Sequence, residues 1–295
     1  MRAPLFLAAA LALSACGGLD QRGIVMPLEE GWAAEVVATE RDGFGSPDGL
    51  LWEGGMLYVA DEGGHAVRAW QPGKKPATLA DAKAGLASPE DLVRDGQGNL
   101  YFSDDTRGGV WRIDPSGRTS ALASPDKGLP STEGIGLTPG GDILVGDGKN
   151  HRVMRVTQAG EVSVLLGPER GIGKPESFAF DDRGNLYIAD NHDDVLYVLT
   201  PDGTLHRAIE KREGFSPESL RFAGGQLLIT DSHHGKLFRY TPEDGLSVVA
   251  LLAGELANVQ GIAADDKGNL YLSVQSDLHH NKGFILRLYR KPARP

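Results

Sequence analysis

Residues 174–209 read KPESFAFDDRGNLYIADNHDDVLYVLTPDGTLHRAI, and turn residues divide this stretch into four short apolar segments. Segments 176–180, 186–190, 195–199 and 204–209 are rich in the β-branched and aromatic residues that strands favour. The Gly-Asn and Asp-Gly pairs between the segments supply the positive φ angles that hairpin turns need. The stretch therefore predicts one sheet of four antiparallel strands.

The same unit recurs along the chain, and each copy starts with a polar residue in an equivalent position. These positions are Asp48, Glu90, Glu133, Glu176, Glu218 and Gln260, spaced 42 or 43 residues apart. Four-stranded units that repeat at this interval are typical of β-propellers, whose blades surround a central channel. We therefore predict an all-β fold, a six-bladed β-propeller with four antiparallel strands per blade, as a single domain over residues 31–295.

The two ends of the repeat region predict how the ring closes. The sixth copy supplies three strands, the last over residues 284–289, while residues 33–38 form an unpaired strand ahead of the first copy. Pairing these two strands closes the ring and removes exposed sheet edges, which invite aggregation. We expect the last blade to be built from both ends of the chain.

Residues 1–15 have the pattern of a signal peptide, because a positive start precedes an apolar run at residues 4–13 that is too short to span a bilayer. Leu13-Ser14-Ala15-Cys16 resembles the lipobox of bacterial lipoproteins, which implies lipidation of Cys16 and a tether over residues 16–30. Gly17 in place of Asp implies the outer membrane, facing the periplasm, as the location in the bacterial cell envelope. The alternative is an ordinary signal peptide cleaved nearby.

Composition limits the partners. The formal net charge of −10 argues against nucleic acid and against an anionic membrane surface, so the expected membrane contact is through the lipid anchor only. Cys16 is the single cysteine, which excludes an intramolecular disulfide. We expect a small-molecule or peptide ligand at the acidic mouth of the channel.

Propeller topology places the start of every first strand at one mouth of the channel, so the six aligned residues should form a ring there, which we name the mouth ring. Two carboxylates about 6 Å apart repel by roughly 3 kcal/mol at an effective dielectric near 20, so the ring must face solvent, take up protons or bind a cation. Oxygen ligands suit calcium, magnesium or manganese. The predicted metal ligands are Asp48, Glu90, Glu133, Glu176 and Glu218, with calcium expected and magnesium, manganese or zinc as alternatives.

The alternative interpretation is structural: the acidic residue belongs to the repeat and bonds the backbone amides of neighbouring blades.

The loops after the second strands open on the same face. Each of five loops begins with an aspartate that is expected to cap the turn by accepting backbone N–H bonds; these are Asp61, Asp104, Asp147, Asp190 and Asp231.

Seven of the eight histidines also follow in these loops, and imidazole is suited to proton transfer near neutral pH. His192 and His233 are the candidate catalytic residues, because they follow the loop aspartates most closely. The alternative is that a loop histidine only bonds the adjacent blade.

Three recurring stretches, P-[DE]-[GS]-[LIF], G-N-L-Y-[IF]-[AS]-D and P-[DS]-G, resemble NHL repeats and the propellers of the gluconolactonase and regucalcin group. The resemblance covers residues from about 30 to the C-terminus. In the lactonase group a divalent metal at the channel mouth is held by a Glu of an early blade and by Asn and Asp at later strand starts. Asp48 matches the family's Pro-Asp-Gly stretch and Glu133-Gly134 is a looser counterpart, but no asparagine occupies the mouth ring.

Two main functions and a more distant third follow from this resemblance. The first is a divalent-metal-dependent hydrolase of lactones or related esters, and the second is a non-catalytic binding module for a sugar, peptide or envelope protein. A lyase resembling the streptogramin-inactivating propellers is a third. No Gly-x-Ser-x-Gly nucleophile elbow is present, so a covalent serine mechanism has no support.

Overall fold

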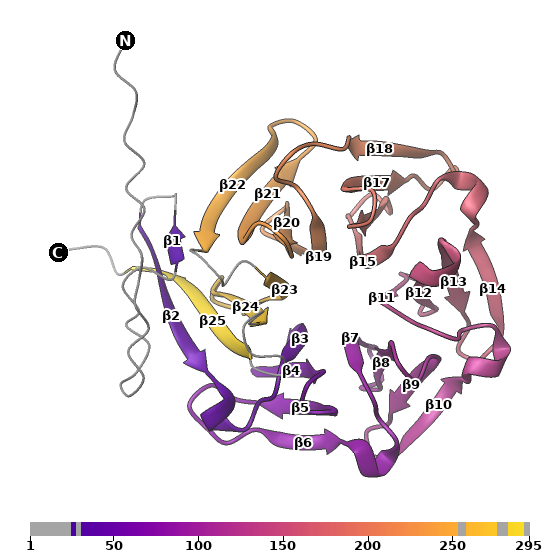
Figure 1. Ribbon diagram of the computed structural model, residues 1–295, viewed down its shortest axis with the longest axis horizontal. Coiled ribbons are helices and arrows are strands. Elements are labelled where there is room, and N and C mark those ends of the chain that lie inside the picture. The colour runs from indigo at the N-terminus through magenta and orange to yellow at the C-terminus, as the bar shows by residue number, and fades with distance from the viewer. Residues whose placement is uncertain (1–24, 28–30, 253–257, 276–282, 292–295) are drawn as a thin grey trace.

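A computed structural model describes residues 25–27, 31–252, 258–275 and 283–291, which form a six-bladed β-propeller (Figure 1). Each blade is a sheet whose first strand lies at the central channel and whose last strand lies at the rim. The predicted fold class is confirmed. Cys16 and the predicted signal peptide lie outside the described residues. No helix within the described ranges is long and apolar enough to cross a membrane.

The strands of each blade follow the chain from the channel outward. Blade one contains β3 (Pro47–Glu53), β4 (Met56–Asp61), β5 (Ala66–Trp70) and β6 (Ala77–Ala80). Blade two contains β7 (Pro89–Arg94), β8 (Leu100–Asp104), β9 (Val110–Ile113) and β10 (Thr119–Ala123). Blade three contains β11 (Ile135–Leu137), β12 (Ile143–Asp147), β13 (Arg152–Val156) and β14 (Val162–Leu166).

The second half of the ring repeats this order. Blade four contains β15 (Pro175–Phe180), β16 (Leu186–Asp190), β17 (Val195–Leu199) and β18 (Leu205–Ile209). Blade five contains β19 (Pro217–Ala223), β20 (Gln226–Asp231), β21 (Lys236–Thr241) and β22 (Gly245–Leu252). Blade six contains β23 (Asn258–Ala264), β24 (Leu270–Gln275), β25 (Gly283–Arg290) and, from the N-terminal side, β2 (Trp32–Ala38).

Short 3-10 helices, which the sequence analysis did not predict, lie in the connections. They are η1 (Glu40–Asp42), η2 (Ala82–Ala84), η3 (Pro125–Lys127), η4 (Gly148–Asn150) and η5 (Pro168–Arg170).

The ring closes as predicted, because β2 pairs antiparallel with β25 and forms the rim strand of blade six. Ala34 pairs with Leu288 and Val36 with Leu286. An additional short strand, β1 (Val25–Pro27), pairs with the rim strand β22 and gives blade five a fifth strand. β1 lies within the segment expected to be a tether, and it covers a sheet edge that would otherwise carry unpaired backbone groups.

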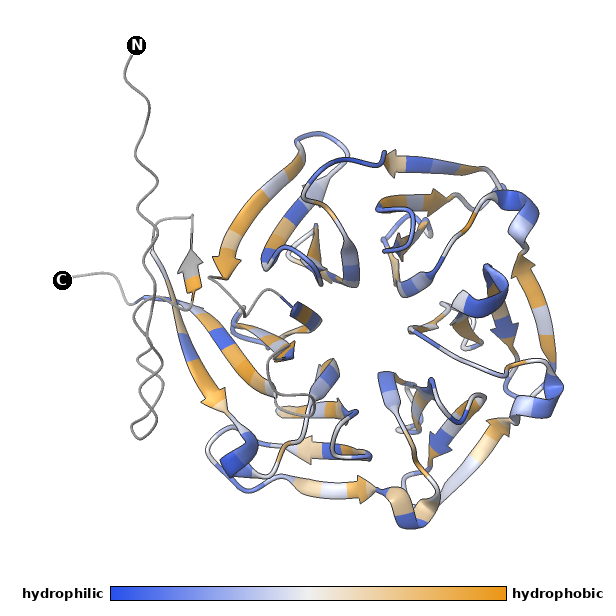
Figure 2. Ribbon diagram, viewed as in Figure 1, coloured by the Kyte–Doolittle hydropathy of each residue, from blue (hydrophilic) through white to orange (hydrophobic). Residues whose placement is uncertain are grey.

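The hydrophobic core lies between neighbouring blades. Alternate residues of a strand point to opposite faces of its sheet, so each blade packs one apolar face on the preceding blade and the other on the following blade. Leu51 and Ala60 of blade one, for example, pack with Leu92 and Phe102 of blade two. Figure 2 shows apolar residues spread through the strands of every blade and polar residues concentrated in the connections. This packing fixes the first strands around the channel.

Candidate functional site at the channel mouth

A β-bulge at the start of the first strand aims two consecutive residues at the channel. In blade one Pro47 pairs with Asp61 and Leu50 pairs with Val59, so Asp48 and Gly49 together oppose one residue of β4. Blades two, five and six have the same shift of register. Bulges re-aim side chains in this way. In these four blades the mouth ring residue and the residue directly after it therefore both line the channel.

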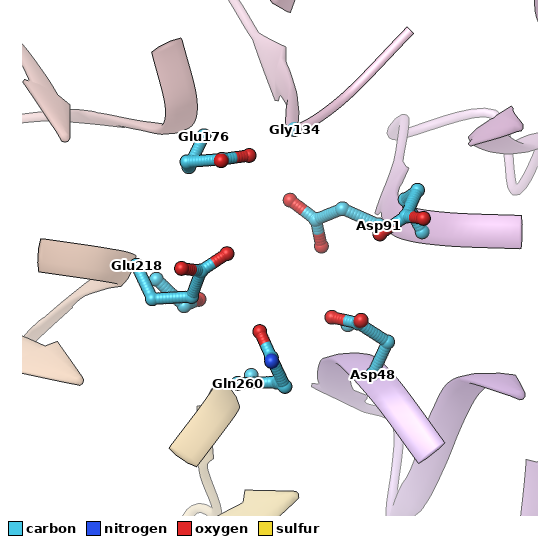
Figure 3. A pocket seen from close by; sticks show the side chains of 10 residues that line it. Asp48, Asp91, Gly134, Glu176, Glu218 and Gln260 are labelled. Atoms are coloured by element: carbon cyan, nitrogen blue, oxygen red, sulfur yellow. The ribbon is translucent and has the colours of Figure 1, made fainter. Parts of the chain in front are cut away.

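Five of the six mouth ring residues, all but Glu133, line one pocket at the channel (Figure 3). The polar side chains that line this pocket are Asp48, Glu90, Asp91, Glu176, Glu218, Ser219 and Gln260. Blade three contributes Gly134 to the lining, while Glu133 of the same blade is bound to Lys174 beside the pocket. The structure thus brings four of the five predicted metal ligands to one pocket, and Glu133 lies beside it.

The amide of Gln260 adds a neutral oxygen to this pocket. Its Nε2 donates to Asn258 Oδ1 at 2.6 Å and to Gln275 Oε1 at 3.3 Å. With the nitrogen engaged on that side, the amide oxygen points to the centre of the channel (Figure 3). The side chains that meet at the centre, those of Asp48, Asp91, Glu218 and Gln260, therefore present oxygen atoms to one another.

Burial and mutual repulsion raise the pKa values of the pocket carboxyls. Burial raises the pKa of Asp48 well above its usual range, and the charges of Glu218, Glu62 and other neighbouring carboxylates raise it further. Burial likewise raises the pKa of Glu90, and Asp48 and Glu62 add to the effect. Burial and like charges thus destabilise the ionised form of these carboxyls, and binding of a proton or a cation would remove this destabilisation.

Asp91 differs from the other carboxyls because backbone amides stabilise its charge. Its Oδ1 accepts from Leu92 N at 2.8 Å and its Oδ2 from Ile135 N at 3.4 Å. Burial raises the pKa of Asp91 to about 6, against the lowering effect of these bonds and of the Arg221 guanidinium. Asp91 can therefore exchange a proton near neutral pH.

Lys174 places a positive charge on the side of the mouth where blades three and four meet. Its Nζ lies 3.2 Å from Glu133 Oε2 and 2.7 Å from Glu176 Oε1. Burial lowers the pKa of Lys174, but the carboxylates of Glu176 and Glu133 outweigh burial and raise it above its usual value. Burial, followed by the charge of Glu218, still leaves the pKa of Glu176 well above its usual range.

A second tier of residues surrounds the mouth ring, one from each blade, at the end of the second strand or directly after it. Its members are Glu62, Asp105, Gly148, Asn191, Ser232 and Gln275. Asn191 Nδ2 donates to Glu218 Oε2 at 2.7 Å, from blade four to blade five. Gln275 Nε2 donates to Asp48 Oδ2 at 3.1 Å and to Glu62 Oε2 at 2.9 Å, from blade six to blade one. The bonds shown for these ring carboxylates come from side chains of adjacent blades, whereas the structural alternative expected backbone amides.

Four loop aspartates, Asp104, Asp147, Asp190 and Asp231, cap their turns as predicted. Asp61, Asp104, Asp190 and Asp231 also hold the connection that enters their blade. Asp190, for example, accepts from Asp193 N at 3.1 Å, Gly173 N at 2.6 Å and Lys174 N at 3.0 Å. Asp104 accepts in the same way from Ala87 N and Arg107 N. All five side chains are fully buried. These residues position the mouth ring.

The two candidate histidines lie in different surroundings. His192 is exposed and lies beside His151, with ring centroids 5.9 Å apart, and it does not line the pocket. His233 Nδ1 lies 2.7 Å from Ser216 Oγ. Burial raises the pKa of Glu218, and His233 is among the neighbours that partly oppose this rise, so His233 lies closer to the mouth ring in electrostatic terms. His279 and His280 fall outside the described residues.

The oxygen-rich pocket fits a hard divalent cation in its donor set. Asp48, Glu90 and Glu218 offer carboxylates and Gln260 offers an amide oxygen, which are the ligand types that calcium prefers. Within the described ranges no group of three or more His, Cys, Asp or Glu side chains is already spaced as a metal site. Cation binding there would require the side chains to draw together.

Sequence reasoning missed Asp91, Glu62, Lys174 and Gln275. A signal existed for Asp91, because the other copies carry Gly or Ser at that position. Lys174 likewise stands where four copies have Ser. Both departures from the repeat can be seen in the sequence. Whether these two side chains point towards the channel, however, depends on the bulge and on the blade junctions.

Comparisons with known proteins support the fold. No family model and no curated protein matches the chain. Among solved structures, a gluconolactonase from Xanthomonas campestris matches with a TM-score of 0.70 and 18% identity, covering 87% of this chain and 89% of that one. Regucalcin from Agrobacterium tumefaciens, described as a calcium-binding protein, matches with a TM-score of 0.67 and 15% identity over 90% of this chain and 98% of that one.

A catalytically inactive variant of virginiamycin B lyase from Staphylococcus aureus, solved with quinupristin, matches with a TM-score of 0.65 and 15% identity, covering 87% of this chain and 99% of that one. These proteins carry different activities on one architecture, as common folds do. The chain therefore has the six-bladed β-propeller fold that gluconolactonase, regucalcin and virginiamycin B lyase share.

Proposed function

We propose that this protein is a divalent-cation-dependent hydrolase of lactones or related esters, with its active site at the acidic mouth of the channel. The observation that carries the proposal is the convergence of Asp48, Asp91, Glu218 and Gln260 on one pocket with their oxygens inward. The structural likeness to a gluconolactonase and to a calcium-binding regucalcin supports the same reaction class.

Asp48, Glu90 and Glu218 would hold the cation, with the Gln260 oxygen as a neutral ligand, and calcium is the preferred ion. A divalent cation bound there would polarise the substrate carbonyl and acidify a water molecule. Gln275 and Asn191 hold Asp48 and Glu218 from behind, so the two carboxylates keep their direction towards the channel. Such support orients ligands in metal sites.

Asp91 would move the proton. The attacking water forms a bond to the carbonyl carbon while Asp91 accepts the proton of that water, and the ring C–O bond then breaks. The proton returns from Asp91 to the alkoxide oxygen, which yields the hydroxy acid. His233 is the alternative proton acceptor, whereas the exposed position of His192 beside His151 gives it a weaker case.

Hydrolysis of a panel of sugar lactones and aryl esters, in chelator and then in excess calcium, tests the proposal. We expect turnover that needs the cation, and a loss of about 10²- to 10⁴-fold in kcat for Asp91→Asn with cation binding retained. Glu213→Gln, at an exposed residue, is the control. Turnover that is equal in chelator and calcium, or unaffected by Asp91→Asn, would contradict the proposed mechanism.

A non-catalytic binding module is the second candidate. It is favoured by the hydrogen bonds that Asn191 and Gln275 make to Glu218 and Asp48, because bonds between blades can be purely architectural. In that case the mouth would bind a cationic group of a sugar, peptide or envelope protein without turnover. Saturable binding of such a ligand, together with the absence of hydrolysis across the panel, would favour the module.

We further propose that the protein works in the bacterial cell envelope, anchored through a lipidated Cys16 at the outer membrane and facing the periplasm. The support is the lipobox-like stretch before Gly17. Metabolic labelling with a palmitate analogue tests the anchor. We expect label on the wild type and none on Cys16→Ser, and equal labelling of both would reject it.

A further inference from the structure

Lys174 is an exception in the repeat. It lies two residues before the mouth ring in blade four, where blades one, two, three and five carry a serine. Two of these serines bond acidic residues of the second tier: Ser88 Oγ donates to Glu62 Oε1 at 3.0 Å, and Ser131 Oγ to Asp105 Oδ1 at 2.6 Å. Only at the junction of blades three and four does this position supply a positive charge.

The fold makes room for this charge by a second exception at the same junction. The second-tier residue of blade three is Gly148, whereas the other blades carry a side chain at this position. A Cβ on Gly148 would lie 2.6 Å from Lys174 Cγ and 3.2 Å from Glu133 Oε1. The lysine stem therefore occupies the volume that the missing side chain leaves open.

The ammonium group contacts one mouth-ring carboxylate of each adjacent blade. Its Nζ lies within 3.2 Å of both Glu133 and Glu176, and the side chains of these two residues are only 11% and 5% exposed. Lys174 thus sits between two buried carboxylates, as a bound cation would. On the other side of the pocket, Asp48 and Glu90 face further carboxylates instead.

We propose that the Lys174 ammonium is a built-in cation that occupies the position between Glu133 and Glu176, and that it confines the exchangeable divalent cation to the half of the mouth lined by Asp48, Glu90 and Glu218. Lys174 then determines how many cations the mouth holds. The location of the exchangeable ion rests on the proposed function. The role of Lys174 as an occupant rests on its own contacts.

Titration calorimetry of the metal-free, full-length protein with calcium or manganese tests the proposal. We expect one ion per chain for the wild type and two for Lys174→Met, because the vacated carboxylates bind the second ion. Lys174→Met/Glu176→Gln should return to one ion, and Lys174→Arg should behave as the wild type. Lys149→Met, at an exposed lysine of the same face, is the matched control.

The outcomes separate the two proposals. If Lys174→Met keeps the wild-type stoichiometry and affinity while its circular dichroism shows a folded protein, the role of Lys174 is overturned. If the variant fails to fold without metal, recovery of the folded spectrum on adding calcium supports the proposal, and failure to recover contradicts it. If the wild type binds no ion but Lys174→Met binds one, Lys174 is confirmed as the occupant and cation-dependent hydrolysis is rejected.

Discussion

Gln275 of the last blade donates from Nε2 to Asp48 of the first blade at 3.1 Å, across 227 residues of sequence. The same nitrogen donates to Glu62 at 2.9 Å, so one amide holds two carboxylates apart at the junction where the ring closes. The contact that completes the mouth is thus also a contact between the two ends of the propeller.

Replacing Gln275 should affect stability and cation binding together. Gln275→Ala removes two hydrogen bonds to carboxyl groups and should lower the free energy of unfolding by about 1–3 kcal/mol in chelator. Calcium should recover part of this loss, since it would screen Asp48 from Glu62. Urea unfolding measures both effects. Gln71→Ala, at an exposed glutamine, is the control, and an equal effect of the two variants would show that the Gln275 bonds contribute nothing.

Gly134→Ala should disrupt the junction of blades three and four. A Cβ at Gly134 would lie 1.5 Å from the backbone oxygen of Glu176, so blade four would have to move outward. Because overpacking against backbone cannot be relieved by a rotamer change, we expect a loss of about 3 kcal/mol or more. Thermal unfolding should show the loss for Gly134→Ala and almost none for Gly140→Ala, whose Cβ would have 3.8 Å to its nearest neighbour. Similar stability of the two variants would refute this close approach.

The metal-free protein should lose stability as pH rises from about 5 to 8. Burial and like charges raise the pKa values of Asp48 and Glu90, and burial raises that of Asp91 to about 6, so the folded state binds protons more tightly than the unfolded chain. The resulting stabilisation is complete below the unfolded pKa of about 4 and is lost as pH rises through the folded values. Asp95 has the opposite effect on stability. Burial raises its pKa, but hydrogen bonds from Asn99 and Tyr101 outweigh burial and lower it, so the stabilisation from Asp95 is lost only below about pH 4.

Thermal unfolding in chelator between pH 4 and pH 8 measures this dependence. The unfolding temperature should be several degrees higher at pH 5 than at pH 8, and Asp91→Asn should flatten the slope between about pH 4 and pH 6. Glu213→Gln should leave the profile unchanged. An unfolding temperature that rises from pH 5 to pH 8 would contradict the raised pKa values of the mouth carboxyls.

The sequence predicted the blades and the ring closure well because both depend on periodic signals. The aligned positions from Asp48 to Gln260 repeat at a nearly constant interval, and the unpaired strand at 33–38 has one obvious partner at 284–289. β1 escaped prediction because a three-residue strand has no period to detect.

The composition of the site was harder to predict, because it depends on local geometry. The bulge turns Asp91 into the channel beside Glu90, and a bulge cannot be read from strand alternation alone. Lys174 reaches the mouth because Gly148, in another blade, leaves space for it. The loop histidines share the face of the mouth ring, but whether His192 or His233 approaches the pocket depends on loop conformation that the sequence pattern does not contain.

The most direct test of the account is thermal unfolding of the full-length protein in chelator and in excess calcium at pH 7.5. A ligand that binds only the folded state at 100 times its Kd stabilises it by about 2.7 kcal/mol, so we expect a rise of several degrees. Asp48→Asn should abolish the rise and Glu213→Gln should preserve it. An unfolding temperature that does not change with calcium, magnesium, manganese or zinc would contradict the central claim that the channel mouth binds a divalent cation.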